Sequence, residues 1–215
     1  MQITWYGHSC FLLTAPGAPR VLTDPCDPET GYALHDIEAE IVTVSHGHHD
    51  HDCVDVVAGS PTIVRLAGER RFGDLSITGI PTWHDDVRGK ARGGNLLFLI
   101  EMGGLRLLHL GDLGHVLGED QVRAVGAVDV LFTPIGGKYT IDAAAARQVA
   151  DALRPRVLIP MHYKTEALSF AIDGLEPFLC ASNDLSIHRL NEASCSIEPD
   201  ALGEDRVLIL DYKKI

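Results

Sequence analysis

The chain has 215 residues and a formal net charge of −12, with 46% hydrophobic and 22% charged residues. These values are typical of a globular protein, so we expect residues 1–215 to form a single domain. No run of 18 uncharged apolar residues occurs, which argues against a membrane span. Lys and Arg never form a block longer than two residues, which argues against generic nucleic-acid binding.

The cysteines and the start of the chain indicate a cellular compartment. The five cysteines form no CxxC pair, and residues 1–10 contain no basic region followed by an apolar run. Reduced thiols in a cytoplasmic protein are the simplest interpretation. The sequence leaves the oligomeric state open, and a homo-oligomer is compatible with it.

The first half of the chain predicts mainly strands. Apolar, β-branched runs bounded by turn residues are typical of strands. They predict strands within residues 3–15, 20–25, 40–45, 61–67, 75–82, 95–101 and 105–110. We expect a short helix at residues 54–59, a polar loop at residues 84–94 and a hairpin turn at Gly103-Gly104.

The second half predicts alternating helices and strands. Helices are expected at residues 118–126, 143–155 and 168–182, and strands at residues 128–135, 156–161 and 205–212. Thr140 and Asp142 are suited to cap the helix that follows them. The chain is therefore of the α/β class.

Histidine clustering is the most informative local feature. Four of the eleven histidines fall between His46 and His51. Alternate side chains of an extended segment share a face, so His46 and His48 can converge on one metal ion. Asp50 and His51 follow where the chain is expected to enter a helix, and they can face a second ion. Imidazole and carboxylate ligands suit zinc, manganese or ferrous iron.

Three more candidate ligands follow strand-like segments. His84, Asp112 and His162 each come directly after an apolar run, and rigid scaffolds present functional groups in such loops. The Asp112 carboxylate can bridge two ions. The alternatives are a surface histidine for His84, a turn or capping carboxylate for Asp112 and a core histidine for His162.

Together these residues resemble the metallo-β-lactamase superfamily. Its HxHxDH motif matches His46 to His51, and its later His, Asp and His match His84, Asp112 and His162 in order. The resemblance runs from Gly7 to about Thr165. Within the superfamily, the sequence is similar to small metal-dependent hydrolases related to ascorbate-6-phosphate lactonase. The segments that carry this similarity are Gly7-His8-Ser9, Thr23-Asp24-Pro25, residues 111–115, Pro134-Ile135-Gly136-Gly137, residues 139–142 and Pro160-Met161-His162-Tyr163.

The resemblance implies a fold and a metal site. The fold is an αββα sandwich, in which two mixed β-sheets are flanked by helices. Two divalent metal ions are expected, with zinc favoured over manganese or iron. One ion would be held by His46, His48 and His84. The other would be held by Asp50, His51 and His162, and Asp112 would bridge the two.

The implied activity is metal-dependent hydrolysis of a small-molecule ester, lactone or amide by a hydroxide that the ions supply. The alternative is a phosphodiesterase acting on a small or lipid phosphodiester. His48 stands where the flavodiiron relatives carry glutamate, which favours hydrolysis over oxygen chemistry. A purely structural metal site is disfavoured, because such sites are usually closed and often rich in thiolate.

Other residues are candidates for supporting roles. Asp50 and His115 are the candidate catalytic proton carriers, and Asp24 is a candidate hydrogen-bond partner of the ligand imidazoles or a simple turn carboxylate. His8 is expected either to line the site or to lie buried beneath it. Lys138 and Tyr163 are candidate substrate contacts, and Lys90 and Arg92 are weaker ones. With two ions, two carboxylates and a hydroxide, the site carries about +1 charge, which tolerates an anionic substrate.

Overall fold

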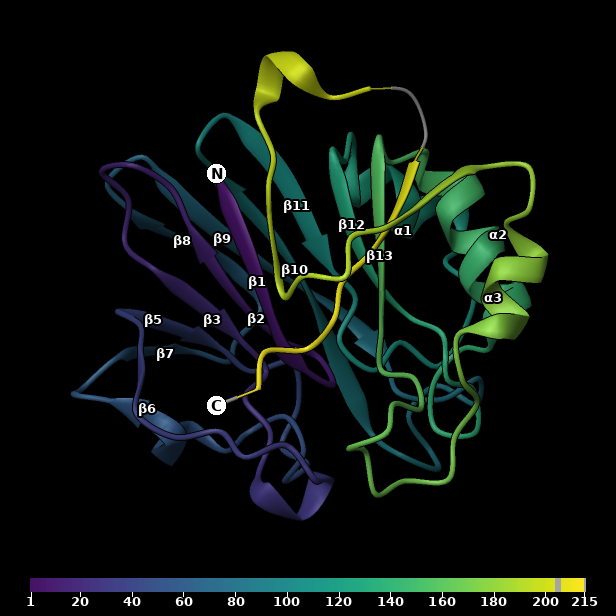
Figure 1. Cartoon of the computed structure of the whole chain (residues 1–215), viewed down its shortest axis with the longest axis horizontal. Coiled ribbons are helices and arrows are strands. Elements are labelled where there is room, and N and C mark those ends of the chain that lie inside the picture. The colour runs from purple at the N-terminus through teal and green to yellow at the C-terminus, as the bar shows by residue number, and fades with distance from the viewer. Residues whose placement is uncertain (204–205, 215) are drawn as a thin grey trace.

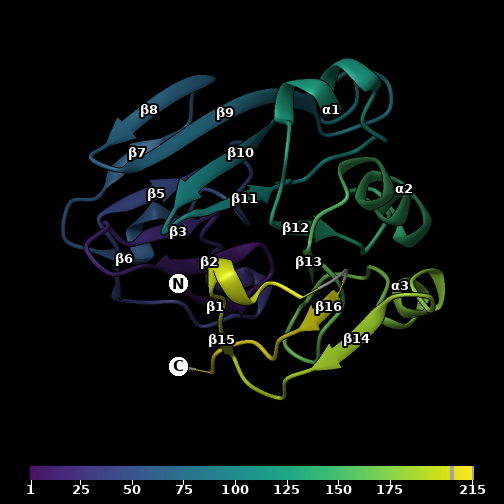
Figure 2. The same ribbon diagram turned by 90° about the horizontal axis from the view of Figure 1, so that it is seen from above.

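Two mixed β-sheets pack face to face in the computed structural model, which describes residues 1–203 and 206–214 (Figures 1 and 2). The first sheet has six strands in the order β15-β1-β2-β3-β5-β7. Its strands β1, β2 and β15 are antiparallel to their neighbours, whereas β3, β5 and β7 run parallel. The bounds are β1 Gln2–Gly7, β2 Cys10–Thr14, β3 Val21–Thr23, β5 Ile41–Thr43, β7 Thr62–Val64 and β15 Ser194–Ser196.

The second sheet has eight strands in the order β14-β16-β13-β12-β11-β10-β9-β8. Strands β8 to β11 form antiparallel hairpins, and the remaining pairs, β11-β12, β12-β13, β13-β16 and β16-β14, are parallel. The bounds are β8 Gly68–Phe72, β9 Leu75–Trp83, β10 Gly94–Met102, β11 Leu105–His109, β12 Val130–Pro134, β13 Val157–Met161, β14 Ser186–Arg189 and β16 Arg206–Ile209. The hairpin predicted at Gly103-Gly104 joins β10 and β11, and both glycines have positive φ.

Alternation along the strands of the six-stranded sheet explains why both of its faces are buried. In β2, Phe11 and Leu13 belong to the core between the sheets, whereas Cys10 belongs to a second apolar cluster on the outer face. Val21 and Leu22 divide in the same way. Successive side chains of a strand point to opposite faces, so apolar residues at consecutive positions predict a strand buried on both sides.

The α-helices lie along the outer face of the eight-stranded sheet (Figure 2). They are α1 Glu119–Val125, α2 Ala143–Leu153 and α3 Glu176–Ala181. Asp142 caps α2 as predicted, because its carboxylate accepts the Ala145 N–H at 2.9 Å. None of the helices in the described ranges is long and apolar enough to cross a membrane.

The predicted α/β sandwich of two mixed β-sheets is confirmed, and a difference in detail lies on the outer face of the six-stranded sheet. Within the described residues, loops and the 3₁₀ turns η1 Pro28–Thr30 and η2 Val54–Val56 cover this face, and no α-helix does. The helix predicted at residues 54–59 is wrong. This segment forms η2 and then β6 Val57–Ala58, which pairs with β4 Ile37–Glu38.

The helix predicted at residues 168–182 is also largely wrong, because only α3 is helical there. Leu168 is buried in the outer cluster of the six-stranded sheet, whereas Phe178 is buried in the core between the sheets. One continuous helix cannot place both side chains in these two clusters, and residues 171–174 are neither helical nor in a strand. The strand predicted at residues 205–212 corresponds to β16, except that residue 205 lies outside the described residues.

Candidate metal centre

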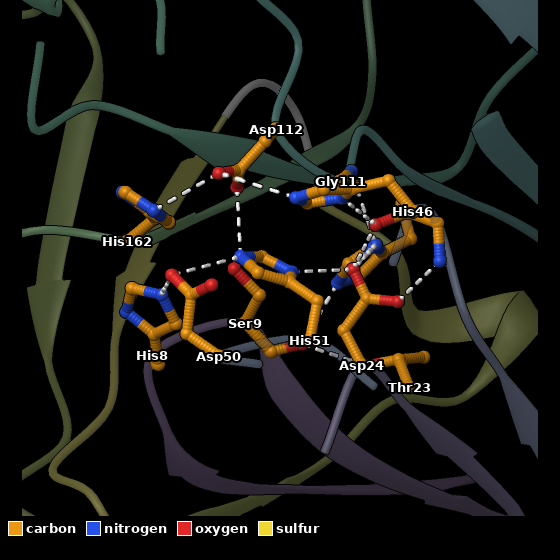
Figure 3. A network of polar contacts seen from close by, with 12 residues as sticks. His8, Ser9, Thr23, Asp24, His46, Asp50, His51, Gly111, Asp112 and His162 are labelled. Carbon is orange, nitrogen blue, oxygen red and sulfur yellow. Dashed lines mark hydrogen bonds and ion pairs between the residues drawn. The ribbon is translucent and has the colours of Figure 1, made fainter. Parts of the chain in front are cut away.

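The candidate ligands come from segments far apart in the chain. Ser45 and His46 follow β5, Asp24 follows β3, His84 follows β9, Asp112 follows β11, and His162 follows β13. Parallel strands end at the same edge of a sheet, so β3 and β5 deliver one set of residues and β11 and β13 deliver the other. Side chains of the two sets point toward one another (Figure 3).

The side chains form two donor groups. In the first, which we call the open group, ligand atoms of His46, His48 and His84 lie within 4.8 Å of one another. His46 is half-buried, and His48 is exposed. In the second, the buried group, the same spacing brings together His8, Asp50, His51 and His162, all of which are buried.

Asp112 lies between the two groups. Its Oδ2 atom is 3.1 Å from His84 Nε2 and 3.3 Å from His162 Nε2, and its Oδ1 atom is 3.1 Å from His51 Nε2. His46 Nε2 is 3.9 Å from Oδ2. Burial favours the protonated carboxyl, but His162 and His51 outweigh burial and hold the pKa of Asp112 well below its ordinary value. Asp112 is therefore a carboxylate that faces imidazoles of both groups.

Several of the converging atoms have no hydrogen-bond partner. They are Nε2 of His46, His51 and His162 and Oδ1 of Asp112, and all are buried. A buried polar atom without a partner costs about 1–3 kcal/mol, so native proteins rarely contain several at one place. Divalent cations would satisfy these atoms, and a set of imidazole nitrogens and carboxylate oxygens suits zinc, manganese or iron. The residues present therefore fit metal ions.

Asp24 is hydrogen-bonded to a histidine of the buried group and, through Ser45, to a histidine of the open group (Figure 3). Its Oδ2 accepts a hydrogen bond from His51 Nδ1 at 2.9 Å and from the Ser45 hydroxyl at 2.5 Å. His46 Nδ1 in turn donates to the Ser45 oxygen at 2.9 Å. Asp24 thus fixes the tautomer of a histidine in each group, so that Nε2 points toward Asp112. This is the arrangement expected of a partner of the ligand imidazoles rather than of a turn carboxylate.

His8 lies beneath the cleft. It occupies the turn between β1 and β2 with a φ of 50° and is fully buried. Its Nε2 donates to Asp50 Oδ2 at 3.1 Å, and its ring lies 4.1 Å from that of His162. Burial, reinforced by His162, lowers the pKa of His8 to about 4, so the imidazole is neutral at pH 7.

Three other candidates do not line the cleft of the ligands. Tyr163 is buried against Trp5, with the ring centroids 5.4 Å apart, and it lines a different cavity. The structure does not bring Tyr163 to the cleft, because the chain turns at His162, where φ is 49°, and the next side chain enters the core. Its predicted substrate contact stays a prediction that this placement does not favour. His115 and Lys138 line a neighbouring hollow of about 570 Å³, which shares His84 with the cleft of the ligands. Their roles as a catalytic group and a substrate contact stay predictions.

Two aromatic residues of the cleft were not predicted from the sequence. Tyr139 and Phe170 line a cleft of about 300 Å³ together with His48, Asp50, His84, Arg92 and Asp112. Tyr139 follows Lys138 in a segment that the sequence had singled out, so a signal was present one residue away. Phe170 falls in the segment predicted as a helix and carries no recognisable signal.

The loop after His84 is organised by its first residue. The Asp85 carboxylate accepts four backbone N–H groups, those of Val87, Gly89, Ala91 and Arg92, at 2.7–3.0 Å. Burial alone would raise the pKa of Asp85, but these four donors outweigh it and lower the pKa. The loop is therefore compact, and it returns Arg92 to the cleft.

Similarity to known proteins agrees with this geometry. The model of a family described as the β-lactamase superfamily domain matches residues 2–162. The chain belongs to the metallo-β-lactamase superfamily. A Thermotoga maritima protein assigned as a Zn-dependent hydrolase of this superfamily has 36% identity and a TM-score of 0.82, with 99% of each chain covered.

Two relatives of known sequence extend the comparison. Both are named UPF0173 metal-dependent hydrolase, and both are 31% identical to the chain. The protein from Archaeoglobus fulgidus matches over 77% of this chain and 84% of its own length. The protein from Methanoregula boonei matches over 88% and 95%. The narrower resemblance to ascorbate-6-phosphate lactonase stays a prediction.

Proposed function

We propose that the protein is a metal-dependent hydrolase of small esters, lactones or amides that works with two divalent ions, zinc being favoured. The observation that carries the proposal is the pair of donor groups that share Asp112, with unpartnered imidazole nitrogens converging beside an open cleft. The names of its relatives, metal-dependent hydrolases, support the reaction class. One ion would be held by His46, His48 and His84, and the other by Asp50, His51 and His162, with Asp112 between them.

Bound divalent ions supply a hydroxide nucleophile near neutral pH and stabilise the charge that develops on the attacked oxygen. The chain itself provides the orientation. Asp50 lines the cleft, and burial would raise its pKa, but the hydrogen bond from His8 and the charge of His51 together outweigh burial and lower the pKa. Asp50 is therefore ionised at neutral pH and is oriented by His8 to accept a hydrogen bond from the nucleophile.

The cleft limits the substrate. Its volume of about 300 Å³ lies at the lower end of the range for small-molecule sites, roughly 300–1,000 Å³. Tyr139 and Phe170 form aromatic walls, and His48 lies at the exposed side. A small substrate with a short acyl part fits this space better than a polymer does.

The test is a hydrolysis screen of the metal-stripped protein after reconstitution with zinc, manganese or ferrous iron. Substrates are short 4-nitrophenyl esters, lactones and anilides, with bis(4-nitrophenyl) phosphate as the phosphodiester. We expect metal-dependent turnover of at least one ester, lactone or anilide, and we expect His48→Ala to reduce it strongly. His188→Ala is the matched control, because His188 is an exposed histidine on the edge strand β14.

Each outcome is informative. Turnover of the phosphodiester with no carboxylic ester, lactone or amide cleaved would replace the proposal with the phosphodiesterase alternative. Equal loss in His48→Ala and His188→Ala would indicate a general effect on the protein rather than on the candidate metal centre.

A further inference from the structure

Arg92 is the one permanent cation among the residues that line the cleft. It shares this lining with His48, Asp50, His84 and Asp112, so the Arg92 side chain and the donor groups border the same small space. Arg92 is exposed and also borders the neighbouring hollow. In a chain with a net charge of −12, a cation at this place needs an explanation.

Contacts with neighbouring residues hold Arg92 in position. Asp85 accepts the Arg92 backbone N–H at 2.7 Å, which fixes the end of the loop. The guanidinium lies 4.8 Å from the centroid of the Tyr139 ring, and its Nη2 donates to the Lys138 carbonyl at 3.2 Å. Stacking on an aromatic ring and one backbone hydrogen bond restrict the side chain but leave most of its five N–H donors free.

The charge of Arg92 is not neutralised by a neighbour. In residues 1–203 and 206–214, no carboxylate forms an ion pair with it at the 4.0 Å limit. The carboxylate of Asp85, at the start of the loop, is occupied by backbone donors. Arginine residues elsewhere in the chain, such as Arg20 and Arg147, are paired with carboxylates. The Arg92 side chain therefore borders the cleft with guanidinium N–H donors that no carboxylate neutralises.

We propose that Arg92 is a carboxylate-binding subsite, and that the substrate carries a carboxylate a short distance from the bond that is hydrolysed. This inference rests on the proposed function. A planar guanidinium matches a carboxylate with two parallel hydrogen bonds. Phosphate groups are usually held by more donors than one side chain supplies, and Lys138 Nζ is directed instead to the Ala171 carbonyl at 3.2 Å. Tyr139 is the positioning residue, because the guanidinium stacks over its ring.

Matched esters test the subsite in the metal-loaded protein. The 4-nitrophenyl esters of butyrate and succinate have the same chain length, and succinate carries a carboxylate where butyrate carries a methyl group. We expect Arg92→Gln to lower the succinyl-to-butyryl ratio of kcat/KM roughly tenfold, mainly through KM. Arg92→Lys keeps the charge but loses the planar fork, and it should retain only part of the ratio.

Lys90→Gln is the control variant. Lys90 is exposed in the same loop and lines neither the cleft nor the neighbouring hollow, so its removal changes the net charge equally. We expect its ratio to match that of the wild type. A ratio that is the same in wild type, Arg92→Gln and Lys90→Gln would overturn the subsite. Equal falls in the two variants would overturn it as well, because they would indicate a general charge effect.

A binding experiment separates the subsite from the reaction. Calorimetric titration of zinc-loaded protein with succinate and with butyrate requires no turnover. Tighter binding of succinate that disappears in Arg92→Gln but persists in Lys90→Gln supports the subsite, even if no ester is cleaved and the proposed function fails. No preference for succinate in the wild type would overturn the subsite, even if butyryl esters are hydrolysed.

Discussion

The open group and the buried group differ in how the chain surrounds them. His48 of the open group is exposed, whereas His8, His51 and His162 of the buried group are fully enclosed. Asp50 is buried at the edge of the cleft. Burial of His51 favours its neutral form, but Asp112 and Asp24 outweigh burial and raise its pKa well above the ordinary value. The buried group is therefore an ion-pair network that also belongs to the folded structure, while the open group presents its donors to the cleft.

The difference in burial predicts different roles for the two groups. A ligand that is enclosed and hydrogen-bonded from behind is held in one orientation before any ion arrives. Its removal should disturb the fold as well as the metal site. A ligand at the exposed side should affect metal binding and catalysis with little effect on the fold.

The largest effect is expected at Asp112, which faces both groups. Asp112→Asn removes a negative charge and a shared ligand atom, so we expect loss of both ions. Activity should fall by more than the roughly 10–100-fold typical of an outer partner. Metal content and kcat/KM of the variant measure this. Retention of two ions with near wild-type activity would show that Asp112 is not shared.

A contrast in stability should follow between the two groups of the metal-free protein. His51→Ala leaves Asp112 and Asp24 buried without their partner, and breaking a buried pair typically costs about 3–5 kcal/mol. His48→Ala changes an exposed side chain and should stay within about 0.5 kcal/mol. Urea unfolding of both variants, with the metal removed, measures the difference. Equal destabilisation would contradict the division between the groups.

A smaller effect is expected at Asp24, which supports one histidine of each group. Asp24→Asn keeps the shape of the side chain but can no longer accept both hydrogen bonds as an anion. We expect zinc affinity to fall roughly 10–100-fold at both ions. Competition with a chromophoric chelator measures the two affinities. Weakening of a single ion would show that the link through Ser45 to His46 has no role.

The metal-free protein should also show a maximum of stability near pH 6.5. Burial lowers the pKa of His8 to about 4 and that of His46 to about 3. In the unfolded chain both take up protons below about pH 6.5, so stability should fall as the pH is lowered from 6.5 toward 4. His51 has a raised pKa, so its contribution is present below pH 6.5 and is lost as the pH rises. Thermal unfolding from pH 4 to 8 measures the curve, and His8→Gln should flatten its acid side.

The sequence predicted the seven ligand candidates because their signals are local. The HxHxDH spacing needs one short segment, and His84, Asp112 and His162 each end an apolar run. The structure brings all seven together, but their assignment to two ions stays a prediction. The single domain, the cytoplasmic location and the absence of nucleic-acid binding also stay predictions.

The walls of the cleft could not be predicted in the same way. Phe170 reaches the cleft because residues 164–174 form a loop, and its apolar neighbours mimic a helix in the sequence. Tyr163 lies one residue beyond a candidate ligand, but the backbone turn at His162 sends it into the core. Such positions depend on loop geometry, which residue types alone do not encode.

The central claim is that the two groups hold two ions with Asp112 between them. Elemental mass spectrometry of the purified, zinc-reconstituted protein, with His48→Ala beside it, tests this most directly. We expect two ions per chain in the wild type and about one in the variant, because the buried group should keep the ion that it holds. One ion or none in the wild type after reconstitution, or an unchanged two ions in His48→Ala, would contradict it.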